Sequence, residues 1–186
     1  MSHRKTLLNL LENYKPENFL ESRAQKLIRD FVEKNSNCFS RSNLAGHITA
    51  SCWLLSPDRT QVLLTHHKKI GRWLQLGGHC DGDPDVRHVA LKEAYEESGI
   101  KNIKILHEQI FDLDIHTIAQ HKNTSAHEHY DIRFVLQALD NNFSISSESI
   151  DLRWVKISDL ITGDLTNDSL ARMAHKWLKQ KNITKI

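Results

Sequence analysis

The sequence lacks any long apolar run, since no stretch approaches the roughly 20 apolar residues that a membrane-spanning helix requires. Residues 1–18 are too polar for a secretory signal peptide. Cysteine is scarce as well, and the three that occur (Cys38, Cys52 and Cys80) have a scattered spacing that matches no cysteine metal site. These absences predict a protein of the reducing cytoplasm with no membrane partner.

The sequence also lacks an excess of charge of either sign. Its 25 Lys and Arg residues nearly balance 23 Asp and Glu residues, which leaves a net charge of +2. This balance excludes the strongly basic surface of a typical nucleic-acid-binding protein, so we expect no nucleic-acid partner. No repeat or low-complexity tract is present, and 186 residues suffice for one domain with an appendage.

Residues 1–44 are predicted to form a helical appendage. Pro16 separates a short helix around residues 7–11 from a longer one, and the Ser- and Asn-rich residues 35–43 are typical of a connector. The second domain then covers residues 45–186 and closes with a helix over 170–179. An apolar stripe on the longer helix must be buried on that domain or against a second subunit, which allows a homodimer: Leu20, Ala24, Leu27, Ile28, Phe31 and Val32.

From residue 47 the pattern becomes that of a sheet. Apolar and β-branched runs predict strands over residues 47–55, 61–65, 73–76, 103–118, 127–138 and 152–155. A single helix over residues 84–98 lies among these strands. The expected fold class is therefore α/β of the α+β type, with helices packed on a mixed, largely antiparallel sheet.

The helix expected over residues 84–98 carries acids on the face that should be buried. At about 100° per residue, Glu93, Glu96 and Glu97 lie on or beside an apolar stripe formed by Val86, Val89, Ala90 and Ala94. Carboxylates this close repel one another, and burying them unpaired is costly. A bound divalent cation would resolve both problems, whereas the alternative is an exposed glutamate cluster on a surface helix.

The segment Gly78–Ile100, GHCDGDPDVRHVALKEAYEESGI, resembles the sequence box of the Nudix hydrolases. The matching positions are Gly78, Glu93, Ala94, Glu96, Glu97, Gly99 and Ile100. The resemblance extends over roughly residues 46–160. It implies an α/β/α sandwich with pyrophosphohydrolase activity, which cleaves a diphosphate linkage in a small-molecule substrate, a nucleoside diphosphate joined to another moiety.

By this resemblance, Gly78, Glu93, Glu96 and Glu97 bind Mg²⁺ or Mn²⁺. Glu93 and Glu97 are the candidate catalytic residues, and which glutamate serves as the base stays open. Two positions depart from the family pattern, because Pro84 replaces a Glu and Lys92 replaces an Arg that are thought to pair. The alternative function is therefore a weak or silent Nudix domain that binds a nucleotide or sugar diphosphate as a sensor.

Twelve histidines are an unusual number. His127 and His129 alternate on a predicted strand and point to one face, while His79 follows Gly78 and His47 begins the first strand. These four positions resemble the metal site of the isopentenyl-diphosphate isomerases, and imidazole ligands favour a transition metal over Mg²⁺. Gly77 stands where the isomerases have Cys, so isomerase chemistry is not expected. Solvated strand residues are the alternative interpretation of these histidines.

Lys68, Arg72 and Trp73 precede the box and are the candidates for contacts with the substrate. Lys and Arg side chains bind phosphate groups, and most of the loop around them is polar. A solvated run of charge is the alternative for this loop.

Overall fold

The computed structural model describes residues 4–120 and 125–183. The helices in that part of the chain are α1 (Lys5–Asn13), α2 (Phe19–Lys34), α3 (Val86–Ser98), the short 3-10 helix η1 (Ile157–Leu160) and α4 (Asp168–Ile183). The strands are β1 (Gly46–Leu55), β2 (Gln61–His67), β3 (Trp73–His79), β4 (Ile103–Ile105), β5 (Asp112–Ile118), β6 (His127–Ala138) and β7 (Ser149–Lys156). None of the helices described is long and apolar enough to cross a membrane.

The strands form one seven-stranded sheet in the order β4–β6–β1–β3–β2–β7, with β5 pairing beside β4 along β6. β1 and β6 are parallel, whereas all other strand pairs described are antiparallel. The expected mixed, largely antiparallel sheet is confirmed. The long parallel register sets His47 opposite His129, so these two histidines lie side by side on neighbouring strands.

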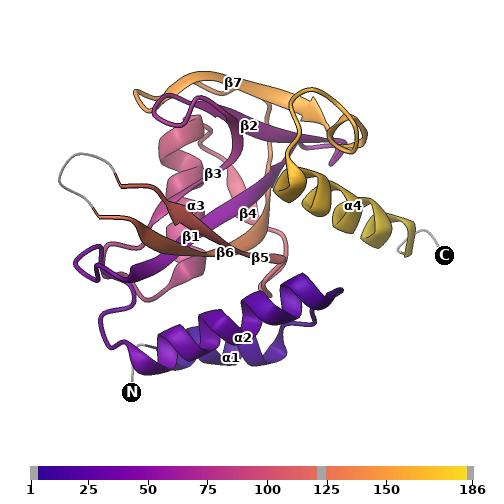
Figure 1. Cartoon of the computed structure of the whole chain (residues 1–186). Helices are drawn as coiled ribbons and strands as arrows, with labels where there is room; N and C mark the ends of the chain where they lie inside the picture. The colour runs from indigo at the N-terminus through magenta and orange to yellow at the C-terminus, as the bar shows by residue number, and fades with distance from the viewer. Residues whose placement is uncertain (1–3, 121–124, 184–186) are drawn as a thin grey trace.

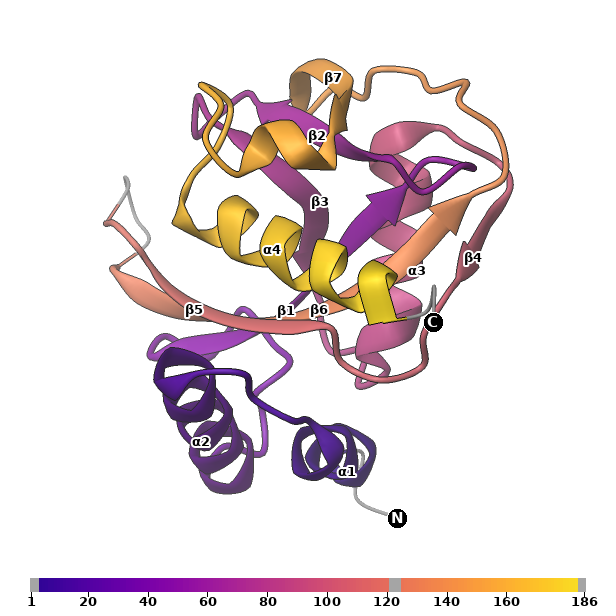
Figure 2. The ribbon, with the colours of Figure 1, turned by 90° about the vertical axis from the view of Figure 1, so that its right-hand side faces the viewer.

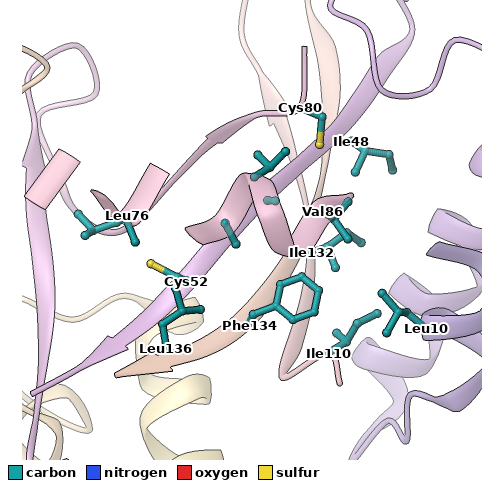
Figure 3. Close-up of a cluster of buried hydrophobic side chains, with 14 of the residues drawn as sticks. Leu10, Ile48, Cys52, Leu76, Cys80, Val86, Ile110, Ile132, Phe134 and Leu136 are labelled. Atoms are coloured by element: carbon teal, nitrogen blue, oxygen red, sulfur yellow. The ribbon is translucent and has the colours of Figure 1, made fainter. Parts of the chain in front are cut away.

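Helices cover both faces of the sheet, as Figures 1 and 2 show. Alternate residues of β1 face opposite ways. Ile48 and Ala50 join a core with α3, α1 and α2, whereas Trp53 and Leu55 join a second core beneath α4. Figure 3 shows the first core, in which Phe134 of β6 lies among side chains from the sheet and the helices. The layers are those of an α/β/α sandwich.

The N-terminal helices pack on the same side of the sheet as α3. Leu7, Leu11 and Ile28 are fully buried in the core that includes α3. Phe31 of α2 also stacks on Tyr130 of β6, with 4.1 Å between ring centroids. The helices therefore share a continuous core with the sheet.

Two positions of the predicted apolar stripe of α2 are not buried within this chain. Leu20 is 67% exposed and Leu27 is 41% exposed, whereas the acidic residue Glu21 is only 2% exposed. The helix turns Glu21 inward because the side chain meets Lys176 of α4 at 2.9 Å. A buried ion pair thus takes the place of part of the expected apolar contact.

Two predicted strands also differ from the structure. Residues 103–118 form two strands, because β4 and β5 pair with different parts of β6 and the chain leaves the sheet between them. β3 does not end at Leu76 but continues through Gly77 and Gly78 to His79. Its glycines pair with Ser51 and Ala50 of β1, so they belong to the sheet instead of following it.

Candidate functional site

Local sequence sets both ends of α3, the helix that carries the box glutamates. The Asp85 side chain accepts hydrogen bonds from the backbone N–H groups of Arg87 and His88, and Gly99 ends the helix in the left-handed conformation with φ 68°. Pro84 lies before this cap, so the expectation that it occupies the first helical turn is wrong. The Asp85 cap is the physical reason, because with Asp85 as N-cap the helix begins at Val86, two residues later than expected.

Glu93 and Glu97 point from α3 toward the two glycines of β3. The backbone N–H of Gly77 donates a hydrogen bond to Glu97 Oε1 at 3.2 Å. The Glu93 carboxylate lies against Gly78, where an added Cβ would be 2.6 Å from Glu93 Cδ. Helical i, i+4 spacing places both acids on one face, and bare glycine backbone permits their close approach. Glu96 lies at the rim, with 58% of its side chain exposed.

Burial disfavours ionisation of the Glu93 and Glu97 carboxyl groups. It raises the pKa of Glu97 to about 8, and the charges of Glu93 and Glu148 act in the same direction against the hydrogen bond from Gly77. Burial also raises the pKa of Glu93, although nearby Lys92 opposes it. A bound divalent cation would relieve both the repulsion between the two carboxylates and the cost of burying their charge.

The donor set therefore fits a hard divalent cation. Glu97 offers buried carboxylate oxygens, Glu93 offers a carboxylate with 15% of its side chain exposed, and Glu96 offers another at the solvent edge. Lys92 Nζ is 3.8 Å from Glu93 and 3.6 Å from Glu96. Within the described residues no cationic side chain pairs with Glu97. Carboxylate oxygens in this combination are ligands that Mg²⁺ and Mn²⁺ accept.

Two residues near this site were not identified from the sequence. Glu148, just before β7, lies close enough for its charge to raise the pKa of Glu93 and Glu97, after the larger effect of burial. Arg41, in the connector before β1, forms a double hydrogen bond with Asp81. No local pattern marks Glu148, because the β2–β7 pairing is what carries it toward the glutamates.

The three substrate candidates lie together at the start of β3. Lys68 and Arg72 are exposed in the turn between β2 and β3, and Trp73 is half-buried. The Trp73 ring stacks with His66 at 5.2 Å between centroids, and the Arg153 guanidinium lies 4.9 Å from the Trp73 centroid. Lys68, Arg72 and Trp73, with His66 and Arg153 beside them, therefore form a basic and aromatic patch at the β2–β3 turn.

A histidine cluster lies where β1, β3, β5 and β6 come together. The centroid of His47 is 4.7 Å from that of His129, 5.0 Å from His127 and 5.1 Å from His79. His116 of β5 is a fifth member, 5.3 Å from His129. The structure thus brings together all four histidines singled out in the sequence, with His47 at their centre.

Burial disfavours the charged form of three imidazoles in this cluster. Burial lowers the pKa of His79 to about 4 and that of His129 to about 3, and neighbouring positive charge adds to the effect. Burial also lowers the pKa of His47. At neutral pH the rings of His79 and His129 therefore carry no charge and keep a lone pair on one nitrogen.

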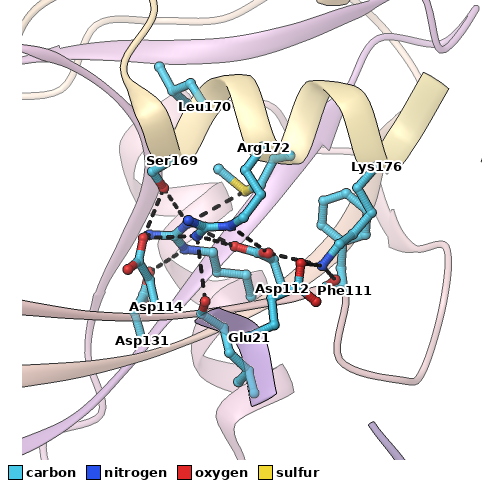
Figure 4. A network of polar contacts seen from close by, with 12 residues as sticks. Glu21, Phe111, Asp112, Asp114, Asp131, Ser169, Leu170, Arg172 and Lys176 are labelled. Carbon is cyan, nitrogen blue, oxygen red and sulfur yellow. Dashed lines mark hydrogen bonds and ion pairs between the residues drawn. The ribbon is translucent and has the colours of Figure 1, made fainter. Parts of the chain in front are cut away.

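A buried network of charged side chains lies beneath α4 (Figure 4). Asp131 accepts hydrogen bonds from the hydroxyl groups of Thr49 and Ser51 and from Arg133 Nε, the last at 2.7 Å. Arg133 also pairs with Asp112 and Asp114 of β5, and Arg172 of α4 pairs with both. Because each charge is paired, this network holds β5, β6 and α4 in one arrangement.

Sequence similarity links most of the chain to a described family. The family model for the NUDIX domain matches residues 46–177, which include the box glutamates and the histidine cluster. The match leaves α1 and α2 outside it. No curated protein is significantly similar in sequence.

Solved structures share the architecture of this chain. A Caenorhabditis elegans Ap4A hydrolase in a binary complex has a TM-score of 0.55 and 17% identity, covering 73% of this chain and 97% of its own. A NUDIX-family hydrolase from Clostridium perfringens has a TM-score of 0.53 and 25% identity, covering 72% and 97%. A MutT protein from Methanosarcina mazei Go1 has a TM-score of 0.57 and 14% identity, covering 75% and 97%. These proteins correspond to the sandwich over nearly their whole length.

Proposed function

The chain belongs to the NUDIX family of hydrolases, and from this premise we propose that Mg²⁺ or Mn²⁺ bound by its α3 glutamates serves to cleave a diphosphate linkage. The proposed substrate is a nucleoside diphosphate joined to another moiety. The name of the similar C. elegans protein, Ap4A hydrolase, supports a phosphorylated nucleoside as part of the substrate.

The observation that carries the proposal is the position of Glu93 and Glu97 against the β3 glycines. Burial raises the pKa of both acids, and within the described residues Glu97 is paired with no cationic side chain. The ionised form of such an arrangement is unfavourable unless a cation binds there, and a metal ion would displace the proton that Glu97 otherwise holds below its raised pKa. Gly78, through its carbonyl group, and Glu96 at the rim complete the proposed ligand set.

A bound divalent ion supplies neutralisation of phosphate charge and a lowered pKa for a water molecule. Hydrolysis forms a bond from the water oxygen to phosphorus and breaks the bridging P–O bond. The water proton passes to a carboxylate, and Glu93 and Glu97 are the two candidates for this base. Lys68 and Arg72 are proposed to contact the phosphate groups, and Trp73 is proposed to contact the organic moiety.

Turnover of a library of diphosphate compounds with Mg²⁺ and with Mn²⁺ tests the proposal directly. Glu97→Gln and Glu96→Gln are each expected to remove most hydrolysis and to weaken divalent-metal binding, while the circular dichroism spectrum stays that of the wild type. Glu12→Gln, at an exposed position on α1, is the matched control and should keep full activity.

Two results would contradict the proposal in different ways. Near wild-type turnover of either variant at saturating metal would show that the box glutamates are not the metal ligands. Tight binding of a nucleotide or sugar diphosphate without turnover by the wild type would favour the sensor function instead.

A further inference from the structure

We propose that His47, His127 and His129 bind a transition-metal ion such as Zn²⁺ at a site separate from the box glutamates. One candidate ligand nitrogen from each ring lies within 4.8 Å of those of the other two. Metal–nitrogen bonds of about 2 Å place the nitrogens around one ion roughly 3 to 4 Å apart, so small ring rotations suffice to close the site. This site lies beyond the function proposed above.

His47 provides the second and independent observation. Its side chain is buried, with the residue only 2% exposed. Neither of its ring nitrogens makes a hydrogen bond of normal geometry with a described residue, although the backbone of Asn43 lies close enough to act on the ring. The buried Nε2 of His129 likewise has no partner among the described residues. A polar atom buried in this way is unfavourable, and native structures nearly always pair such atoms. A metal ion at the centre of the cluster accounts for one nitrogen of His47 and for Nε2 of His129, since each imidazole offers one ligand atom.

The orientation of His127 is also that of a metal ligand. Its Nδ1 lies 2.8 Å from the carbonyl oxygen of Ser125. Because a carbonyl can only accept, Nδ1 must donate the proton, and the lone pair is therefore on Nε2. A backbone carbonyl that fixes the tautomer in this way is a common partner of ligating histidines. His79 lies beside this group, with its ring centroid 4.9 Å from that of His129, but it is not among the three whose ligand atoms lie within 4.8 Å of one another.

The histidine and glutamate sites use opposite faces of the sheet. Gly78 faces α3, where Glu93 lies against it. The next residue, His79, points to the other face because side chains alternate along a strand. It is opposite Thr49, whose hydroxyl faces Asp131 in the buried network. One site therefore offers carboxylate oxygens and the other offers imidazole nitrogens.

The chemistry of the two ligand sets predicts different ions. Imidazole nitrogens bind Zn²⁺ and related transition metals well, whereas Mg²⁺ prefers oxygen ligands. His79, His127 and His129 are each half-buried, so the cluster lies near the surface of the protein. We therefore expect Zn²⁺ to occupy the histidines while Mg²⁺ occupies the glutamates.

The test uses the full chain without a histidine tag, stripped of metal by a chelator and titrated with Zn²⁺ and with Co²⁺. The wild type is expected to bind one Zn²⁺ at the cluster, and bound Co²⁺ should show the visible absorption of imidazole coordination. His127→Gln and His129→Gln should each weaken Zn²⁺ binding by at least roughly 10- to 100-fold. Loss of a residue that only hydrogen-bonds to a metal ligand already costs that much, and these variants lose a ligand itself. His175→Gln, an exposed histidine on α4, is the matched control and should bind Zn²⁺ as the wild type does.

A Glu97→Gln variant separates this inference from the proposed function. It should keep Zn²⁺ affinity while losing Mg²⁺ affinity, and neither readout depends on turnover. Unchanged Zn²⁺ affinity in both cluster variants would overturn the inference, as would a wild type that binds no Zn²⁺. Since His127 is half-buried, its replacement tests the site even if the His129 variant fails to fold.

Discussion

Lys176 of α4 and Glu21 of α2 form an ion pair of 2.9 Å with side chains only 4% and 2% exposed. Lys176 Nζ also donates to Asp112 Oδ1 and to the hydroxyl group of Tyr14, both at 3.0 Å. Burial opposes ionisation of Glu21, but hydrogen bonds from Tyr14, the Glu17 backbone and Lys176 outweigh it and lower the pKa. The N-terminal and C-terminal helices are therefore joined by a buried charge network.

Lys176→Met should lower the free energy of unfolding by about 3 kcal/mol, because it leaves Glu21 buried without its cation. Lys179→Met is the control, since Lys179 pairs with Glu17 at the surface with side chains 65% and 34% exposed. Loss of that exposed pair should cost less than about 1 kcal/mol. Chemical denaturation at pH 7 measures both values, and equal values would contradict the structural role given to Lys176.

Gly78→Ala should impair hydrolysis with little effect on stability. The new Cβ would lie 2.6 Å from Glu93 Cδ, and a flexible side chain can move away from it. We expect turnover to fall about 100-fold from misplacement of the carboxylate, while unfolding free energy changes by less than about 1 kcal/mol.

Gly77→Ala is the contrasting variant. Its Cβ would lie 2.6 Å from Ser51 Cα, which is backbone of the adjacent strand and cannot move away cheaply. Overpacking of this kind should cost about 1 to 3 kcal/mol of stability. If thermal unfolding shows Gly78→Ala to be the less stable variant, the assignment of these two contacts is wrong.

Lys92→Arg should change turnover by less than about tenfold, or roughly 1.4 kcal/mol in the barrier. Lys92 lies within 4 Å of Glu93 and Glu96, and Pro84 cannot supply the partner that an Arg would have in the family pattern. Steady-state kinetics with saturating Mg²⁺ measure the effect. A gain in turnover of several hundredfold would instead show that Lys92 makes the natural protein a weak enzyme, which would support the sensor function.

Glu97→Gln should stabilise the metal-free protein at pH 8. Burial raises the folded-state pKa of Glu97 to about 8, with Glu93 and Glu148 adding and the Gly77 N–H opposing. The unfolded carboxyl loses its proton near its ordinary pKa of about 4.3. The folded state therefore binds more protons than the unfolded state between these values, so stability falls as pH rises through that window.

The variant lacks this titration, so the two proteins should differ little at pH 4 and diverge toward pH 8. We expect the variant to be more stable by at least about 1 kcal/mol at pH 8, as one unit of pKa shift is worth about 1.4 kcal/mol. Urea denaturation in the presence of a chelator measures the difference. Added Mg²⁺ should stabilise the wild type and not Glu97→Gln, and a parallel pH profile for both proteins would contradict the buried position of Glu97.

Much of the candidate site could be predicted from the sequence because it depends on local geometry. The 3.6-residue period of a helix is enough to place Glu93 and Glu97 on one face, and Gly99 marks its end. The bounds predicted for β6, residues 127–138, match the structure, and period-2 alternation already puts His127 and His129 on one side. Each of these features needs only neighbouring residues in one regular element.

Tertiary structure decided the features that join distant parts of the chain. The parallel register of β1 and β6 sets His47 beside His129, and the β2–β7 pairing carries Glu148 toward the glutamates. The inward turn of Glu21 likewise depends on Lys176, a partner in a distant helix. Side-chain periodicity determines which face a residue takes within its own element, whereas strand register and the pairing of buried charges determine what that face meets.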